Sequence, residues 1–428
     1  MKDQGNQSWG SRLAGRLPFY YGWLMVPVAM VAQAVTGVGQ TYGISVFNPS
    51  LLESLGISLS ALSGAYMVGT LAAALPQTLI GSLMDRLGIR KTTLGILLLL
   101  GAACQLFSRV DSLPALLVGF FSLRLLGQGA LSLMAGNIPA LWFRKRLGTV
   151  TGIVSSGFSI SMAVLPPFFL YLINQLGWRA AYARLGVLVW LIALPLVALL
   201  RDGPADVGQE LDGGISEEAR KAQALPKADD VWTAAQARKT PAYWIMVSNA
   251  ALWAMVITAV FFNLLSILDA QGITAGVAAA TYTTYAAASL ATQLLMGPIA
   301  DRGSLRVLLL ICMSSLAAGI AVLSQAAVPW MAHSYAVLIG ISAGLISLLG
   351  GTLFARYYGR ESLGQLKGGM LTAQVAGSSL GPLITGLIYD LTGSFRISLW
   401  IFVGLLIPAA LLSLRAVRPD RPHPSREG

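Results

Sequence analysis

Charged residues are scarce in this chain, because Asp, Glu, Lys and Arg make up only 11% of its 428 residues while 55% are hydrophobic. Soluble domains normally carry about a quarter of their residues as charges. A soluble core does not need this much apolar surface, whereas a protein that crosses a bilayer does. The composition therefore excludes an ordinary soluble domain and indicates a membrane protein.

Cysteine and histidine are almost absent as well. The two cysteines, Cys104 and Cys312, lie inside apolar stretches, and the two histidines, His333 and His423, are far apart in the sequence. Such spacing provides neither a disulfide framework nor a cluster of metal ligands. The chain also has no paired catalytic carboxylates and no phosphate-binding loop. We therefore expect no metal, no cofactor and no enzymatic activity.

Basic residues outnumber acidic residues by 29 to 18, but they form short clusters between apolar runs instead of one patch. This distribution argues against a nucleic-acid partner and is typical of cytoplasmic membrane loops. With the N-terminus in the cytoplasm, 24 Lys and Arg residues fall on the cytoplasmic side and 4 on the external side. We expect a multi-pass protein of the cell inner (plasma) membrane, surrounded by lipid bilayer, with both termini in the cytoplasm.

Hydropathy predicts twelve membrane-spanning helices, since each span must satisfy its own backbone hydrogen bonds. The expected spans cover approximately residues 20–48, 60–84, 91–109, 113–142, 148–173, 181–200, 242–268, 276–300, 305–325, 329–356, 364–389 and 397–415. A polar stretch separates the sixth span from the seventh. The predicted domains are a cytoplasmic tail at 1–19, a six-helix bundle at 20–200, a cytoplasmic linker at 201–241, a second six-helix bundle at 242–415 and a cytoplasmic tail at 416–428.

The sequence also repeats itself at an offset of 216 residues. The matched pairs are Gly81 and Gly297, Asp85 and Asp301, Gly148 and Gly364, and Pro166 and Pro382. A constant offset across separate loops and helices predicts two parallel halves related by pseudo-symmetry. Many membrane transporters are built from two such repeated halves, and their substrate site lies between the halves, near the middle of the bilayer.

The segment from Gly81 to Lys91 reads Gly-Ser-Leu-Met-Asp-Arg-Leu-Gly-Ile-Arg-Lys. It resembles the loop between helices 2 and 3 of major facilitator superfamily transporters, G-x-L-x-D-R-x-G-x-R-[KR], at every fixed position. The resemblance implies an all-α membrane protein of twelve transmembrane helices in two six-helix bundles. It also implies gating by this loop and its repeat, at Gly81, Asp85, Arg86, Gly88, Arg90, Asp301 and Arg302.

Three further motifs resemble the bacterial monocarboxylate and oxalate/formate branch of that superfamily. They are Tyr20-Tyr21-Gly22-Trp23, the segment from Trp142 to Arg146 followed by Gly152 and Gly157, and Gly381-Pro382 followed by Tyr389-Asp390. The chain departs from this branch where its relatives usually carry charged groups. Gln293, Gln374 and Tyr42 stand where relatives have arginine or lysine, and Ser289 stands where animal relatives have aspartate. This pattern argues against a doubly charged substrate.

Polar side chains follow single faces of several expected helices at spacings of three, four or seven residues. We expect such stripes to line a wet central cavity, although interhelical hydrogen bonding is an equally ordinary role for any one of them. The candidate substrate-binding residues are Gln40, Tyr42, Arg124, Gln128, Tyr282, Tyr285, Ser289, Gln293, Gln374 and Ser378.

Arg124 is the only basic residue expected near the middle of the bilayer, where a charge is costly and is a functional candidate. It is interpreted either as the partner of a substrate carboxylate or as a structural residue that binds carbonyl groups between helices 1 and 4. No acidic residue is expected near the middle of the bilayer. We therefore expect facilitated diffusion, exchange, or co-transport in which the substrate brings its own proton.

The sequence as a whole predicts a monomeric carrier that moves small monocarboxylates or similar small organic solutes by alternating access. One alternative is an exporter of neutral or amphipathic compounds, which permissive aromatic cavities would suit. Another alternative is a non-transporting membrane sensor. A sensor normally carries a soluble signalling domain, and the linker at 201–241 is too short and polar to form one.

Overall fold

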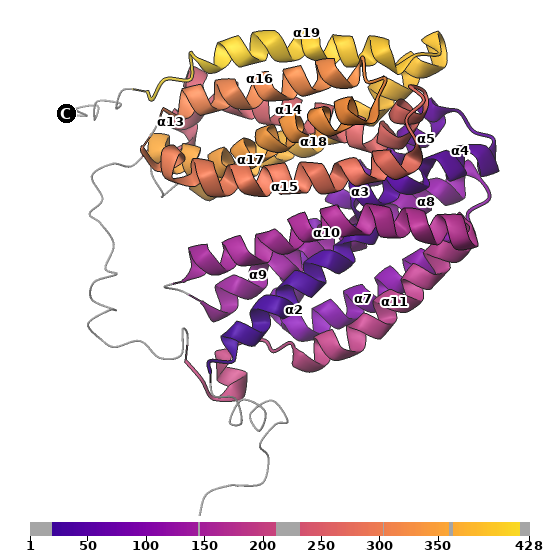
Figure 1. Ribbon diagram of the computed structural model, residues 1–428. Helices are drawn as coiled ribbons and strands as arrows, with labels where there is room; N and C mark the ends of the chain where they lie inside the picture. Colours follow the sequence, from indigo (N-terminus) through magenta and orange to yellow (C-terminus); the bar gives the residue numbers. More distant parts are fainter. Residues whose placement is uncertain (1–18, 144–145, 211–231, 303, 359–362, 420–428) are drawn as a thin grey trace, which may run out of the picture. The chain divides into compact units, whose positions relative to one another are not determined.

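The computed structural model describes residues 19–143, 146–210, 232–302, 304–358 and 363–419, which are helical throughout with short connections. The prediction of an all-α membrane protein is confirmed. The chain divides into two compact units (Figure 1). Unit 1 comprises Met1–Pro226 and Phe261–Ser266, and unit 2 comprises Lys227–Val260 and Ile267–Gly428.

Unit 1 is built from long apolar helices and several short segments that interrupt them. Its helices are α2 (Gly22–Val35), η1 (Thr36–Gly39), α3 (Thr41–Ile44), η2 (Ser45–Phe47), α4 (Asn48–Leu55), α5 (Leu59–Ala74), α6 (Gln77–Leu87), α7 (Ile89–Phe107), α8 (Leu113–Leu123), η3 (Arg124–Leu131), α9 (Ser132–Trp142), α10 (Leu147–Leu176), α11 (Trp178–Leu199) and η4 (Pro204–Val207).

The first expected span is not one continuous helix. It passes from α2 into the 3-10 turn η1 and then breaks at Gln40, whose backbone is extended with ψ 153°. The cause is visible in the local sequence, because Gly37 and Gly39 both weaken the helix at this point.

Unit 2 contains longer and more regular helices. They are α13 (Ala234–Arg238), α14 (Pro241–Asp269), α15 (Ala275–Arg302), α16 (Leu305–Leu323), α17 (Pro329–Tyr358), α18 (Leu363–Thr392) and α19 (Phe395–Ser413). Helices α15 and α17 share the most extensive contact, where Gly340 and Gly344 bring the two backbones together. A Cβ atom on Gly340 would lie 2.7 Å from the carbonyl oxygen of Tyr285.

Ten helical stretches in the described residues are long and apolar enough to cross a membrane. The two remaining expected spans, 60–84 and 276–300, correspond to α5 with α6 and to α15. The helix of span 60–84 is interrupted at Leu75 and Pro76, so α5 has only 16 residues. Span 276–300 lies in one helix of 28 residues, which is long enough to cross but richer in Thr and Tyr.

The two ends of the expected linker are ordered against their own units. In unit 1, Pro204 and Val207 of η4 are buried, and Gln209 accepts a hydrogen bond from the backbone N–H of Tyr21 at 3.0 Å. In unit 2, α13 begins with a capping box formed by Thr233 and Gln236. The linker residues 211–231 lie outside the described part of the chain.

Candidate functional site

The break in the first span of unit 1 lies directly against a second irregular segment. The fourth span changes from α-helix to the π-helical segment η3 at Arg124. Gly39 packs on this segment so closely that a Cβ atom there would overlap the carbonyl oxygen of Leu123 and lie 3.1 Å from the Cα of Gly127. Interrupted helices and π-bulges are common at transporter and other functional sites. We name the group formed by Gly39, Thr41, Tyr66, Thr70 and Arg124 the arginine cluster.

Arg124 is only 2% exposed and holds the two irregular segments together. Its Nη1 donates hydrogen bonds to the carbonyl oxygen of Gly39 and to Oγ1 of Thr41, both at 3.3 Å. Its Nε donates to Oγ1 of Thr70 at 3.1 Å, and its guanidinium lies 5.0 Å from the ring centroid of Tyr66. The Gly39 carbonyl, which a continuous helix would have satisfied, is thus bound by the arginine.

No carboxylate pairs with Arg124 among the residues that the structure describes. Its partners are neutral hydroxyl, carbonyl and aromatic groups, so its positive charge is hydrogen-bonded but not neutralised. An uncompensated cation in a membrane span favours an anion in its neighbourhood. The arrangement therefore fits the interpretation of Arg124 as a structural residue that binds a carbonyl group between helices. Its positive charge is still available to act on a substrate through space.

The other predicted residues of unit 1 lie in or next to the same interrupted segments. Gln40 is 8% exposed, and its Nε2 donates to Oγ1 of Thr36 and to Oγ of Ser132, both at 3.3 Å. Tyr42 is 2% exposed, and its hydroxyl has no hydrogen-bond partner in the described part of the chain. Gln128 lies in η3 and is partly exposed.

The sequence analysis did not identify Thr41, Tyr66 and Thr70 as partners of Arg124. The glycine-rich segment Thr36–Gly39 was the local signal that the helix breaks here.

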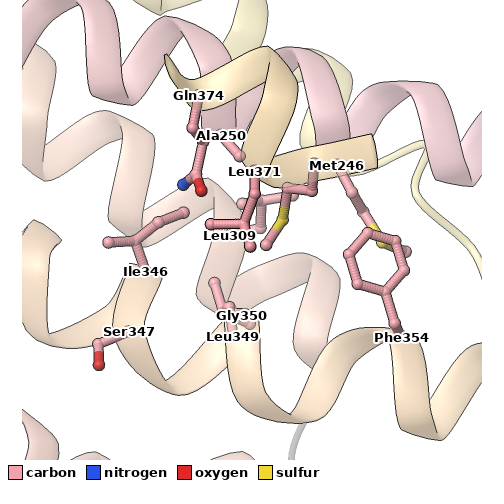
Figure 2. Close-up of a pocket in the computed structure, with 11 residues that line it drawn as sticks. Met246, Ala250, Leu309, Ile346, Ser347, Leu349, Gly350, Phe354, Leu371 and Gln374 are labelled. Atoms are coloured by element: carbon pink, nitrogen blue, oxygen red, sulfur yellow. The ribbon is translucent and has the colours of Figure 1, made fainter. Parts of the chain in front are cut away.

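Unit 2 contains a cavity of about 300 Å³ bounded by α14, α16, α17 and α18 (Figure 2). Nine of its eleven lining residues are apolar, and Gln374 and Ser347 are the two polar ones. Figure 2 shows the Gln374 side chain extending from α18 toward the residues of α17. The lining residues are Met246, Ala250, Leu309, Ile346, Ser347, Leu349, Gly350, Phe354, Met370, Leu371 and Gln374.

The predicted stripe on α15 is continuous, because the helix has no break between Tyr282 and Gln293. Tyr282 and Tyr285 are buried, with 0% and 9% of their surface exposed, and Ser289 accepts a hydrogen bond from Gln293 of the same helix at 3.3 Å. None of the four lines the cavity beside Gln374. Ser378, in turn, donates to the carbonyl oxygen of Val375 in its own helix.

His333, which the sequence analysis treated only as one of two widely separated histidines, bridges two helices of unit 2. Its Nδ1 lies 2.8 Å from Oγ1 of Thr284, which joins the beginning of α17 to α15. The helical repeat alone could not reveal this pair, because the two residues are 49 positions apart.

The expected gating loop is anchored in unit 1 by a carboxylate from the end of α11. Gly88 has φ +84°, and a Cβ atom there would also lie 2.5 Å from Oδ1 of Asp202. The same oxygen accepts the backbone N–H of Arg90 at 2.8 Å, while Nε of Arg90 donates to the carbonyl oxygen of Val197 at 3.0 Å. Asp202 therefore caps the N-terminus of α7, where the helix dipole favours a negative charge.

The remaining gating residues have fewer described contacts. Arg86 is exposed, and a Cβ atom on Gly81 would meet no atom within 4 Å. The side chains of Asp85, Asp301 and Arg302 lie outside the described residues.

Comparison with known proteins decides the family. A sequence profile of the Major Facilitator Superfamily matches residues 29–282 and 254–428. The chain belongs to the Major Facilitator Superfamily. It is therefore a multi-pass membrane transporter, as the loop motif from Gly81 to Lys91 predicted.

Two relatives of this superfamily member match nearly its whole length, and a third matches a shorter part. An uncharacterized 38 kDa protein in the 23S RNA operon of Thermoproteus tenax is 27% identical over 90% of this chain and 93% of its own. Monocarboxylate transporter 11 of Mus musculus is 27% identical over 92% of this chain and 86% of its own. The oxalate:formate antiporter of Oxalobacter formigenes is 22% identical over 61% of this chain and 58% of its own.

Solved structures support the same fold for this Major Facilitator Superfamily chain. A bacterial homolog of the human lysosomal transporter Spinster, in an inward-facing and occupied conformation, matches with a TM-score of 0.70 and 17% identity. The match covers 94% of this chain and 97% of that protein. At this level of identity the likeness establishes the fold alone.

The Asp202 cap provides a first test of the gating loop. Asp202→Ala should lower the free energy of unfolding by about 0.5–2 kcal/mol, the usual cost of losing an N-cap. The measurement is the thermal unfolding midpoint of the purified transporter. Asp111→Ala is the matched control, because Asp111 is exposed and lies outside this loop. Equal midpoints for the two variants would contradict the capping role of Asp202.

Proposed function

We propose that this transporter carries small monocarboxylic acids, or similarly small polar organic solutes, across the cell inner membrane by alternating access, as a monomer with both termini in the cytoplasm. One relative is named a monocarboxylate transporter, and another is named an oxalate:formate antiporter, of whose two substrates formate is a monocarboxylate. The excess of Lys and Arg in alternate loops supports the orientation.

The observation that carries the proposal is the amide of Gln374 in the cavity of unit 2. It has no hydrogen-bond partner among the described residues, while the wall around it is mostly apolar. An unpartnered polar group in an apolar pocket is the usual way to orient a small ligand. A solute with a short hydrocarbon body and one polar head complements this lining.

The neutral lining of this cavity favours a solute without a full charge. Gln374 and Ser347 can hydrogen-bond a protonated carboxyl group but provide no counter-charge for a carboxylate. The cation of the arginine cluster, Arg124, belongs to unit 1. A weak acid that arrives with its own proton suits a cavity that has hydrogen-bonding groups but no counter-charge. The transport cycle then needs no titratable acid in the protein.

Uptake into proteoliposomes tests the substrate class. Lactate, pyruvate, formate and acetate should be compared with neutral analogues, with and without an inwardly directed proton gradient. The monocarboxylates should enter faster when the external side is acidic, because more of each acid is then protonated. Protein-free liposomes measure the passive permeation that must be subtracted. No protein-dependent uptake of any monocarboxylate would overturn the proposal.

Gln374→Leu should reduce monocarboxylate uptake about 3- to 10-fold, mainly through a higher KM. The loss of one neutral hydrogen bond, about 0.5–1.5 kcal/mol, accounts for this magnitude. Leucine matches the apolar wall, so the fold should remain intact. Gln325→Leu is the matched control, since Gln325 is exposed beyond the end of α16. An unchanged KM in Gln374→Leu would remove Gln374 from the substrate site.

Export of neutral, amphipathic compounds is the second candidate. The cavity contains Met246, Met370 and Phe354, and flexible methionines together with aromatics suit varied apolar ligands. Deletion of the gene should then raise the sensitivity of the cell to such compounds. Increased sensitivity without any loss of monocarboxylate transport would favour export.

A further inference from the structure

A second cavity, of about 280 Å³, lies in unit 2 where α16 begins and the chain leaves α19. Arginines from three different segments gather around it: Arg306 from the first turn of α16, Arg356 from the last turn of α17, and Arg418 from the segment after α19. None of its described lining residues is acidic. The lining residues are Ser304, Leu305, Arg306, Arg356, Tyr357, Val417 and Arg418.

Tyr357 holds the last of these segments in place. Its hydroxyl donates a hydrogen bond to the carbonyl oxygen of Ala416 at 2.9 Å, two residues before Arg418. Burial raises the pKa of the Tyr357 phenol, and the positive charges of Arg306, Arg356 and Arg418 only partly oppose this shift. The phenol therefore remains protonated at neutral pH and acts as a hydrogen-bond donor. All three arginines are exposed, and the hydrogen bond from Tyr357 to Ala416 holds the segment that carries Arg418 against α17.

The helix terminus at this cavity adds to its positive potential. Ser304 is the N-cap of α16 and makes no side-chain capping bond, and Ser304, Leu305 and Arg306 line the cavity, so the N-terminus of this 19-residue helix lies at the cavity. The positive end of a helix dipole and arginine guanidinium groups both favour phosphate, and arginine binds it through two parallel hydrogen bonds.

The apolar surface next to the cavity distinguishes a lipid from a soluble anion. Val417, a lining residue, is 52% exposed, and the neighbouring Leu414 and Leu411 are 43% and 61% exposed. Val307, which follows Arg306 on α16, is 41% exposed. Helices α16 and α19 pack side by side (Figure 1), and both carry exposed apolar side chains near the cavity.

We propose that this cavity binds the phosphate headgroup of an anionic phospholipid, with Arg306, Arg356 and Arg418 as its ligands. The acyl chains then lie along the exposed apolar residues of α16 and α19. Basic pockets at the ends of transmembrane helices are suited to such headgroups. With the termini in the cytoplasm, the bound lipid belongs to the inner leaflet. The site does not overlap the cavity of Gln374, so it is independent of the proposed substrate.

The test measures lipid binding by the full-length transporter in detergent. Short-chain phosphatidylglycerol should raise the thermal unfolding midpoint and remain bound in native mass spectrometry, whereas phosphatidylcholine should do neither. Replacing Arg306, Arg356 and Arg418 together by Gln should weaken binding about 100-fold, from about fivefold for each arginine lost near a membrane surface. The matched control replaces Arg109, Arg184 and Arg396, which are exposed and do not line the cavity.

Tyr357→Phe separates the geometry of the site from its charge. This variant keeps every arginine but loses the hydrogen bond to Ala416, so phosphatidylglycerol binding should fall while non-specific attraction to anionic surfaces does not change. Stabilisation by inorganic phosphate equal to that by phosphatidylglycerol would overturn the assignment to a lipid. Equal losses in the control triple variant, or no phosphatidylglycerol effect on the unsubstituted protein, would overturn the site itself.

Discussion

Arg124→Gln should reduce transport strongly and also destabilise the protein. The substitution removes the charge-assisted hydrogen bonds to Gly39, Thr41 and Thr70, so the carbonyl at the break in the first span loses its partner. An unsatisfied buried acceptor costs about 1–3 kcal/mol. Carboxylate uptake should fall at least 10-fold, because the buried positive charge of the arginine cluster is lost as well.

Two measurements on Arg124→Gln separate its structural role from an effect on the substrate. The thermal unfolding midpoint reports how much the arginine cluster stabilises the contact between the first and fourth spans. Uptake per folded molecule reports the effect on transport. Arg109→Gln is the matched control, because Arg109 is exposed at the end of α7. A lowered midpoint with normal uptake would leave Arg124 as a structural residue only. An unchanged midpoint would show that the arginine cluster does not stabilise unit 1.

Arg124→Lys refines this experiment. Lysine retains the positive charge but lacks the planar fork that reaches Thr70, Thr41 and the Gly39 carbonyl together. If the charge acts on the substrate through space, lysine should restore part of the uptake while the midpoint remains low. Equal uptake by the Lys and Gln variants would contradict an electrostatic role in transport.

Gly39→Ala should have the second large effect, on stability. The added methyl group would overlap the carbonyl oxygen of Leu123 and press on the Cα of Gly127, and both obstacles are backbone atoms that cannot rotate away. Overpacking of this kind costs about 1–3 kcal/mol or more. The purified variant should unfold at a lower temperature, and its yield from membranes should fall.

Gly136→Ala is the control for this experiment. Gly136 lies in α9 of the same fourth span, but a Cβ atom there would meet nothing within 4 Å. Alanine favours the helix over glycine by up to about 1 kcal/mol, so the midpoint should stay equal or rise slightly. If Gly39→Ala behaved like Gly136→Ala, the close contact between η1 and η3 would not be needed for the fold.

Local sequence patterns predicted the helices well, but not their interruptions. Spans at 60–84 and 113–142 were expected to be regular, yet one breaks at Pro76 and the other contains the π-helical segment η3. Hydropathy averages over about twenty residues and therefore cannot resolve a local change in the hydrogen-bond pattern. Gly37, Gly39 and Pro76 were the available local signals.

The candidate site was predicted in part. Arg124 was identified because a charge in an apolar span is conspicuous in any sequence. Its partners Thr41 and Thr70 were not identified, because small hydroxyl residues are common in membrane helices and the pairs are 83 and 54 residues apart. Gln374 was expected to line a wet central cavity and lines a mostly apolar cavity of unit 2, whereas Tyr282 and Tyr285 of α15 are buried and do not line that cavity.

The sequence by itself determined the class of this protein. Residue spacing along the chain and hydropathy are enough to recognise its apolar composition, its 216-residue repeat and the loop motif from Gly81 to Lys91. Tertiary structure decided which side chains meet: Arg124 with the Gly39 carbonyl, Asp202 with the N-terminus of α7, and three distant arginines around one cavity. These contacts depend on how helices far apart in the chain pack, and a one-dimensional pattern carries no record of that packing.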